Sequence, residues 1–455
     1  MLHSLKKNLT NPDTLTYWMN HLLVIYAFLL PISKYAGSFI FFIILILFLL
    51  RRNFLSYLTP VFKNNVVQAF ILFFIIHIVW LIGTENMSQA KLSINLAKYS
   101  LFPIIFLSFI DKRFSPYIIG GFISGMLFSE LFSYAIQFHL IPWKLTYLSI
   151  PIYQAYLIND PSPFLHHSHY AASIAFVSVL LMYKMFKSDL TLIQKGLSLF
   201  FITTISINLS LVGGRVGYLL YISLILFLIL YIYRKKFVKP FISILLLISS
   251  LFIIAYSYSP MFKSKIQETQ KTAQGFYEGK MDFRTSFGSR VGFWYYASDI
   301  IKENWIVGVG TGDYMDTVRD NIPSSQNNTY IKNSFVHPHN IYVMILLQFG
   351  IIGLIVFFNI FYQMYRQKVN DDYLNFIKLS VIITFVLALM TETFWARYYL
   401  PFFVLIVSIT LAFDTLPSRY KPIYTSKIYI AYAILLLLAI LNAKINFIIA
   451  AIKSI

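Results

Sequence analysis

Residues 341–358 read IYVMILLQFGIIGLIVFF, an apolar stretch without a single charged side chain. Such a run is typical of an α-helix that crosses a lipid bilayer, which needs about 20 mostly apolar residues. The composition supports the same interpretation for the whole chain, because 58% of its 455 residues are hydrophobic and only 12% are charged. A soluble domain carries roughly 25% charged residues. The sequence therefore predicts an all-α polytopic membrane protein, and it excludes an ordinary soluble enzyme, a disordered chain and a disulfide scaffold.

Apolar runs recur along the chain and predict about 12–13 transmembrane helices. Basic residues gather in the short turns between these runs, as the positive-inside rule produces, so we expect a cytoplasmic N-terminus. These turns account for the net charge of +19. Outside them the sequence has no basic stripe with interleaved aromatic residues, so we do not expect nucleic-acid binding. The expected spans lie near residues 18–33, 36–50, 65–83, 95–110, 116–137, 168–186, 195–212, 216–233, 239–258, 339–363, 376–396, 398–413 and 427–450.

One long polar segment interrupts the apolar runs, and alternation of the spans places it on the outer side of the membrane. We therefore expect three parts: N-terminal transmembrane helices in 1–258, a large loop with short helices in 259–338, and C-terminal transmembrane helices in 339–455. A loop of this size in an otherwise tight bundle is usually functional.

A glycine-rich turn, Gly213-Gly214-Arg215-Val216-Gly217, falls between two spans at their outer end. Glycine lets the backbone turn tightly and approach a ligand closely. The guanidinium of Arg215 presents a planar fork that matches phosphate oxygens. The alternative is an interfacial arginine that only reaches toward the headgroups. Glycines rather than anchoring aromatics flank Arg215, which favours a functional role.

The long loop carries two further features. Ser289-Arg290 precedes an amphipathic stretch in which Trp294, Ala297 and Ile301 share one helical face, and a solvated loop charge is the alternative role for Arg290. Residues 306–313 read IVGVGTGD, which resembles a nucleotide loop but lacks a βαβ context. We expect a turn that needs the backbone freedom of glycine.

The segment His337-Pro338-His339-Asn340 stands directly before the span at 341–358. Proline is favoured at helix starts, so these histidines should lie at or just before a helix N-terminus. The positive end of the helix dipole disfavours an imidazolium there, and a neutral imidazole can act as a general base. A helix cap with incidental histidines is the alternative.

A second histidine group, His166-His167 and His169, is also predicted on the outer side, and with 337 and 339 it is a possible metal site. No carboxylate stands at ligand spacing beside either group, so we expect neither a metal nor a cofactor. The chain has no Walker A motif and no mid-span charges of the kind that ion-coupled transporters need. Arginine and histidine on one face suit binding of a phosphate-bearing anion and removal of a proton from an acceptor.

In three elements, taken in order, the chain resembles the O-antigen ligase and O-antigen polymerase superfamily of bacterial envelope glycosyltransferases. The first element is the Gly214-Arg215-Val216-Gly217 turn. The second is the loop segment with Ser289, Arg290, Trp294, Ala297, Gly308, Gly310 and Gly312. The third is His337-x-His339-Asn340, followed by an apolar helix with Gly350 and Gly353. Gln348 departs from the family pattern, since members often carry an acidic residue there, and we assign it no catalytic role.

The resemblance implies a multi-pass, GT-C-like helical bundle in the bacterial inner membrane. It also implies one large periplasmic loop and an active site that faces the periplasm. The implied donor is a glycan on undecaprenyl pyrophosphate, and the implied acceptor is a sugar hydroxyl of lipid A–core. We expect Arg215, Arg290 and Arg397 to bind the pyrophosphate, and His339 or His337 to deprotonate the acceptor in one inverting, metal-independent displacement. An O-antigen polymerase is the main alternative. A protein O-oligosaccharyltransferase and a transporter of lipid-linked sugars are weaker ones.

Overall fold

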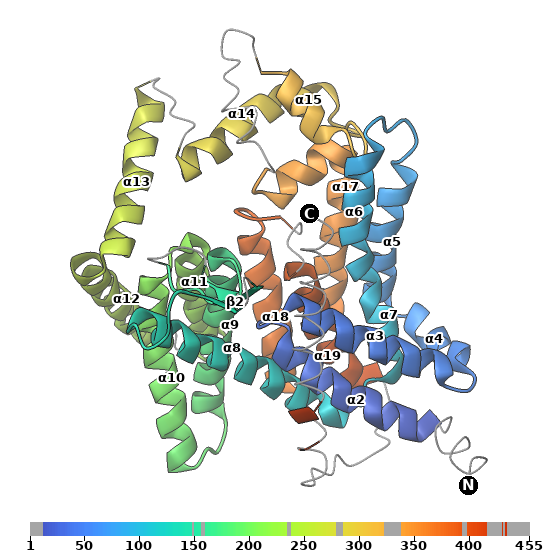
Figure 1. The fold of residues 1–455 in the computed structure, drawn as a ribbon, viewed down its shortest axis with the longest axis horizontal. Coiled ribbons are helices and arrows are strands. Elements are labelled where there is room, and N and C mark those ends of the chain that lie inside the picture. Colours follow the sequence, from blue (N-terminus) through green and yellow to red (C-terminus); the bar gives the residue numbers. More distant parts are fainter. Residues whose placement is uncertain are drawn as a thin grey trace.

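The computed structural model describes residues 12–147, 150–155, 160–233, 238–278, 285–322, 338–393 and 398–415, together with 430, 433 and 434. Helices make up nearly all of this part of the chain, as Figure 1 shows. The exception is a short antiparallel hairpin of β1 (Lys144–Tyr147) and β2 (Ile150–Gln154), which carries an irregularity between Leu145 and Thr146. The all-helical fold class predicted from the sequence is confirmed.

The helices of the N-terminal half pack side by side, with α2 against both α3 and α8 and α9 against α10 and α11. Their bounds are α2 Pro12–Leu29, α3 Lys34–Leu50, α4 Phe54–Phe62, α5 Asn65–Val79, α6 Met87–Ala97, η1 Lys98–Leu101, α7 Phe102–Phe109, η2 Lys112–Phe114, α8 Ser115–Gln137, α9 His167–Lys187, α10 Leu192–Leu211, α11 Arg215–Ile232 and α12 Val238–Tyr258.

Three helices of the predicted long loop lie together at one end of the bundle (Figure 1), and three more helices complete the described chain. The loop helices are α13 Pro260–Tyr277, α14 Ser286–Glu303 and α15 Tyr314–Asp320; the others are α17 Ile341–Arg366, α18 Asp372–Ala388 and α19 Tyr399–Thr415.

Six helical segments of the described residues are long and apolar enough to cross a membrane, or seven if one bent pair counts as a single span. The bent pair joins Tyr35–Leu50 and Phe54–Phe62 at 109°. Other expected spans form shorter apolar helices, such as Asn65–Val79 and Tyr399–Ala412. The expected span at 427–450 lies almost wholly outside the described residues. The chain is a multi-pass membrane protein.

Helix α19 forms the centre of the bundle. Every residue from 398 to 412 is buried, and the helix packs against α7, α8 and α18. Its sequence is apolar on all sides, which is the pattern of a helix surrounded by protein. Phe402 stacks on Phe122 of α8, and Phe403 lies against Phe385 of α18. The central helix thus fixes the positions of the helices around it.

Helix α17 is broken at Gly350, whose φ of +61° lies in the left-handed region. The loop of residues 305–313 bonds to the break: the amides of Val309 and Gly310 donate to the carbonyls of Leu347 and Gln348, and the amide of Ile351 donates to the carbonyl of Trp305. Gly308 and Gly310 also have positive φ, so the turn predicted from IVGVGTGD is confirmed. This turn has a structural role. The break in α17 leaves buried backbone groups without their helical hydrogen bonds, and the turn supplies partners for them.

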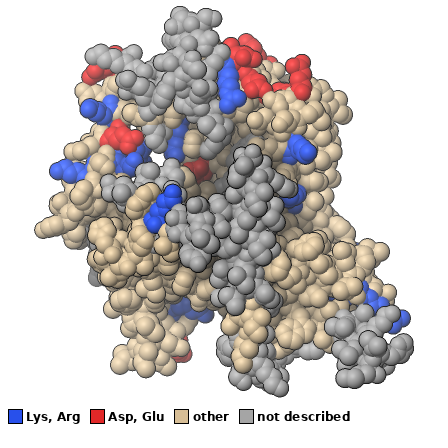
Figure 2. Space-filling model, viewed as in Figure 1, with Lys and Arg blue, Asp and Glu red and all other residues tan. Residues whose placement is uncertain are grey.

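Charged side chains are unevenly distributed over the molecule. In the view of Figure 2, most of the visible acidic and basic groups lie toward the end that carries α13–α15, above a largely uncharged surface. This agrees with a bundle whose apolar sides face lipid and whose polar end faces water.

Candidate active site

His339 lies just before α17, as its sequence position predicted, and Asn340 caps that helix by accepting hydrogen bonds from the amides of Tyr342 and Val343. The φ of His339 is +49°, a left-handed conformation that is uncommon in residues other than glycine. The indole of Trp294 on α14 donates a 2.8 Å hydrogen bond to the carbonyl of Pro338. The loop helix therefore holds the backbone that carries His339.

Glu392 follows α18 and lies directly beside His339. The amide of Ile341, at the start of α17, donates to the carbonyls of Leu389 and Glu392, which ties the two segments together. The Glu392 side chain is only 7% exposed; Oε2 lies 3.8 Å from Nδ1 of His339, and Oε1 lies 3.8 Å from the guanidinium of Arg290 on α14. Three elements thus bring a base, an acid and a cation together.

Electrostatics keep Glu392 ionised. Burial alone raises the pKa of this carboxyl, but interactions with His339, His169 and Arg290 outweigh that effect and hold the pKa well below its usual range. A buried carboxylate beside an imidazole fixes the orientation of the ring and stabilises it when it is protonated. The arrangement can therefore support general-base chemistry at His339.

Arg215 begins α11, directly after the glycine turn. A Cβ at Gly214 would lie 2.6 Å from the carbonyl oxygen of His167, so only glycine permits this close approach of the turn to α9. The Arg215 guanidinium forms a 2.6 Å ion pair with Glu268 of α13, and Lys265 lies 3.4 Å from the same carboxylate oxygen. One anionic oxygen is thus held between two cations, as a phosphate oxygen would be.

Asp160 and His167 form a second acid–imidazole pair, beside the turn that carries Arg215. Asp160 is buried, and its Oδ2 lies 2.8 Å from Nδ1 of His167. The same oxygen accepts a hydrogen bond from the amide of Gly213, and Oδ1 accepts one from the hydroxyl of Ser162. Sequence reasoning missed this pair, because the acid stands seven positions before the histidine in an irregular segment.

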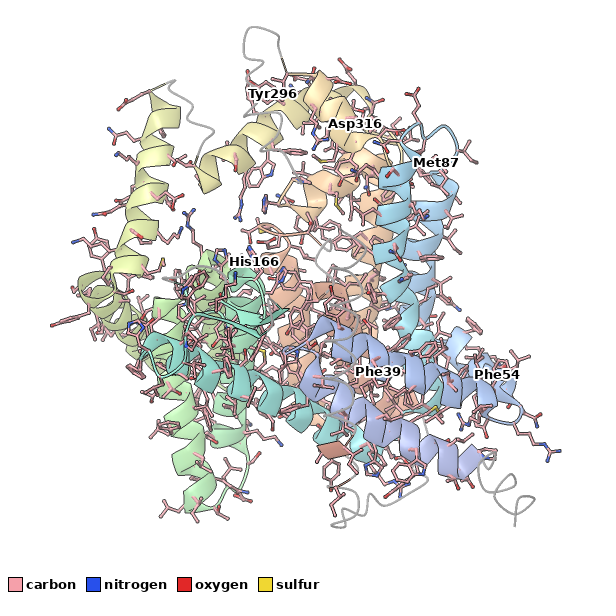
Figure 3. All side chains as sticks on the ribbon, in the orientation of Figure 1. Phe39, Phe54, Met87, His166, Tyr296 and Asp316 are labelled. Carbon is pink, nitrogen blue, oxygen red and sulfur yellow. The ribbon has the colours of Figure 1, made fainter. Side chains whose placement is uncertain are left out.

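The remaining histidines lie between the two acid–imidazole pairs. The ring centroid of His166 is 4.3 Å from that of His167 and 5.5 Å from that of His169. Figure 3 shows His166 where α9 begins, on the side of the bundle that faces α14. Within the described residues, no three or more His, Cys, Asp or Glu side chains are arranged to hold a metal ion.

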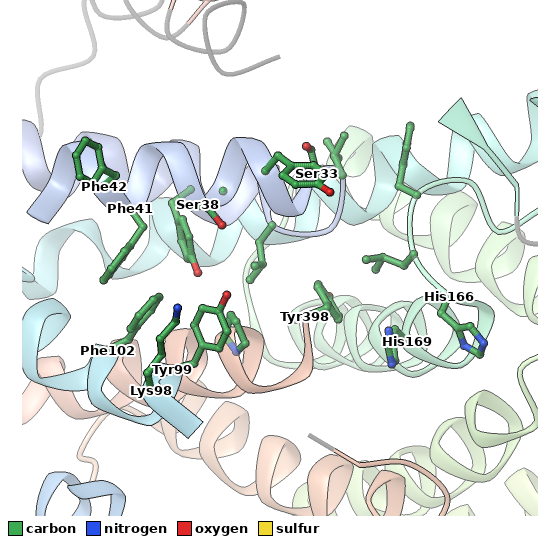
Figure 4. Close-up of a pocket in the computed structure, with 18 of the residues that line it drawn as sticks. Ser33, Ser38, Phe41, Phe42, Lys98, Tyr99, Phe102, His166, His169 and Tyr398 are labelled. Carbon is green, nitrogen blue, oxygen red and sulfur yellow. The ribbon is translucent and has the colours of Figure 1, made fainter. Parts of the chain in front are cut away.

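A cavity of about 860 Å³ ends at His166 and His169 and extends away from them between α3, α7 and α19. Figure 4 shows the two histidines and Tyr398 toward one end, and Phe41, Phe42 and Phe102 toward the other. The cavity is therefore polar where it meets the histidine cluster and aromatic where it leaves it. Lys98 and Tyr99 also line the aromatic part.

The structure thus brings Arg290 and His339 together through Glu392, and it places Arg215 at the neighbouring Asp160–His167 pair. His337 and Arg397 lie outside the described residues. No carboxylate stands at ligand spacing beside the histidines in the sequence, but in the fold Glu392 reaches His339 from a distant segment and Asp160 reaches His167 from an irregular one. Glu392 is a lone acidic residue in an apolar stretch of the sequence, and this isolation is the signal that could have identified it as a site residue.

Fold and site together define a multi-pass membrane protein with a phosphate-compatible, acid–base site at one end of its bundle. Residues 199–358 match the family model described as Wzy_C, O-antigen ligase. Its members are glycosyltransferase-like ligases and polymerases that act on lipid-linked glycans. The match spans Arg215, Arg290 and His339. A search of curated proteins finds no match for this chain.

Proposed function

We propose that the protein is an inverting glycosyltransferase that moves an O-antigen glycan from undecaprenyl pyrophosphate to a sugar hydroxyl of lipid A–core on the periplasmic face of the inner membrane. The cluster of His339, Glu392 and Arg290 carries this proposal. It combines a base for the acceptor with a cation for the departing phosphate, and the match to the O-antigen ligase family covers two of its three members.

In the proposed reaction, the acceptor hydroxyl attacks the anomeric carbon and passes its proton to His339. With Nδ1 turned toward Glu392, Nε2 is the ring nitrogen that would take this proton. The carboxylate would orient the ring and stabilise the imidazolium that forms. General-base catalysis of this kind contributes typically 10²–10⁴-fold in rate.

The bond between the anomeric carbon and the phosphate oxygen breaks in the same step, and the electron pair leaves with the pyrophosphate. Arg215 and Arg290 would bind the pyrophosphate and stabilise its growing charge. Glu268 now pairs with Arg215, so the donor phosphate must displace that carboxylate. Arg397 remains a third proposed phosphate ligand.

The cavity supports a lipid-linked donor. Its polar end lies at His166 and His169, within the same histidine cluster that joins the two acid–imidazole pairs. Its aromatic end would accept the first isoprene units of the carrier, because burial of apolar chain in such a lining is favourable. The remainder of the carrier would lie in the bilayer.

Transfer by purified variants in liposomes tests the site. We expect His339→Gln to lower kcat by about 10²-fold or more while donor binding persists, since the base acts on the acceptor. His337→Gln is the matched variant for the neighbouring histidine, and it should retain activity if His339 is the base. Full activity in both variants would contradict the assignment of either histidine as the base.

A further inference from the structure

The Asp160–His167 pair has no task in the reaction as described, yet it is built into the site. Asp160 is 1% exposed and accepts hydrogen bonds from Gly213 and Ser162 in addition to its contact with His167. A buried carboxylate satisfied by that many donors remains fixed in place. It holds His167 through Nδ1 and so fixes the orientation of the imidazole ring.

His167 lies beside the glycine turn that carries Arg215. The backbone of His167 touches Gly214, and a Cβ at Gly213 would lie 3.4 Å from Nδ1 of His167 and 3.6 Å from Cε of Lys265. The ring of His167 contacts Asp160 and His166 of its own segment, and the turn beside it leads to Arg215 of α11, which pairs with Glu268 next to Lys265 on α13. Two of these groups, Arg215 and Lys265, hold an anionic oxygen of Glu268 between them.

We propose that His167, fixed by Asp160, is the proton donor to the pyrophosphate that leaves. This inference rests on the proposed function. As the bond from the anomeric carbon to the phosphate oxygen breaks, the Nε2 proton of the His167 imidazolium moves to an oxygen of that phosphate. A terminal phosphate has a second pKa of about 6, so it shares a proton readily with an imidazole.

The protons balance across the two acid–imidazole pairs. The acceptor hydroxyl loses one proton to His339, and the pyrophosphate gains one from His167, so the protein keeps its total number of protons. His166 and His169 lie between the pairs and offer a path for the return of the proton. Burial, and after it the neighbouring His167, lower the pKa of His166, so its ring is neutral near pH 7 and would pass a proton on rather than hold it.

The test compares two substitutions at position 167. The side-chain amide of His167→Asn mimics Nδ1 and keeps a donor for Asp160, but it removes Nε2. The longer amide of His167→Gln mimics Nε2 instead. His139, an exposed histidine with φ of +57°, supplies the matched control His139→Asn. We expect His167→Asn to lower kcat by about 10–10³-fold, His167→Gln to retain more activity as a hydrogen-bond donor, and the control to match the wild type.

The pH profile separates proton donation from packing. If a residue must donate a proton, kcat falls at high pH, where that residue has lost its proton. We expect His167→Asn to abolish this fall and Asp160→Asn to move it to lower pH. Asp160→Asn also serves if the position-167 variants fail to fold. Inorganic pyrophosphate should be a weaker competitive inhibitor of His167→Asn than of the wild type. This inhibition can be measured whether or not kcat changes.

The outcomes distinguish this inference from the proposed function. If the wild type transfers glycan and His167→Asn keeps its kcat, its pH profile and its inhibition by pyrophosphate, the proton-donor role is wrong and the proposed function stands. If the wild type neither transfers glycan nor is occupied by pyrophosphate, both are wrong.

Discussion

The Oε2 atom of Glu392 lies 3.8 Å from Nδ1 of His339, although the first residue follows α18 and the second precedes α17. The amide of Ile341 donates to the carbonyl of Glu392, so the backbone as well as the side chains joins the two segments. The pair is held by the bundle rather than by a flexible loop, which suits a base that must meet its acceptor in one geometry.

Glu392 should make stability depend on pH. Burial alone would raise the pKa of Glu392, but His339, His169 and Arg290 outweigh burial and lower this pKa in the folded protein. The stabilising effect of the carboxylate is therefore fully present above the pKa of the unfolded chain, about 4.3. That effect is lost as pH falls through the folded pKa. We expect the unfolding temperature of the wild type in detergent to fall more steeply below pH about 4.3 than that of Glu392→Gln. Equal slopes would contradict the ionised state of Glu392.

Arg215 should dominate recognition of the donor. We expect Arg215→Ala to lower kcat/KM for transfer by about 10²–10³-fold, since a cation that meets developing charge in a water-poor site has an effect of that size. Arg215→Lys should recover part of the loss, because it keeps the charge without the planar fork. Arg319→Ala is the matched control, as Arg319 lies on α15 and its guanidinium is 3.4 Å from the carboxylate of Asp316 on the same helix. Wild-type kinetics for Arg215→Ala would contradict the pyrophosphate role.

Glu268 should compete with the donor for Arg215. Both partners of this ion pair are about a quarter exposed, and such pairs contribute at most about 1 kcal/mol. We expect Glu268→Gln to lower the KM for the donor by about two- to fivefold with little change in kcat. Glu303→Gln, at an exposed position on α14, is the control. A higher KM for Glu268→Gln would show that Glu268 helps to bind the substrate instead.

Gly308 should be essential for stability rather than for chemistry. Its φ is +69°, and a Cβ there would lie 2.4 Å from the carbonyl carbon of Gln348, so Gly308→Ala opposes the contact that closes the break in α17. We expect a loss of about 1–3 kcal/mol in the free energy of unfolding. Gly196→Ala is the matched control, because nothing lies within 4 Å of the added Cβ and alanine favours a helix. Equal stability of the two variants would refute the structural role of the 305–313 turn.

Apolar length, basic turns and glycine signals were enough to predict the helical membrane fold and three of the site segments. Arg215, Arg290 and His339 each stand in a local pattern that sequence alone reveals. The acidic partners do not. Glu392, Glu268 and Asp160 reach the site from separate segments, and only tertiary packing determines which cation or imidazole each one meets.

The break in α17 shows a second limit of local patterns. The run 341–358 predicts one uninterrupted helix, because glycine is tolerated within an apolar span. The kink arises from the backbone of residues 305–313, which bonds to the carbonyls of Leu347 and Gln348. A contact between segments that are distant in sequence therefore decided the shape of a helix whose existence the sequence predicted.

The most direct test of the central claim is transfer by purified protein in liposomes that contain an undecaprenyl-pyrophosphate glycan, with and without lipid A–core, in the presence of EDTA. We expect glycan-extended lipid A–core and free undecaprenyl pyrophosphate only when lipid A–core is added. A ladder of longer lipid-linked glycans from donor alone would replace the ligase with a polymerase. An intact donor in every sample, or a donor that only crosses the bilayer, would contradict glycan transfer altogether.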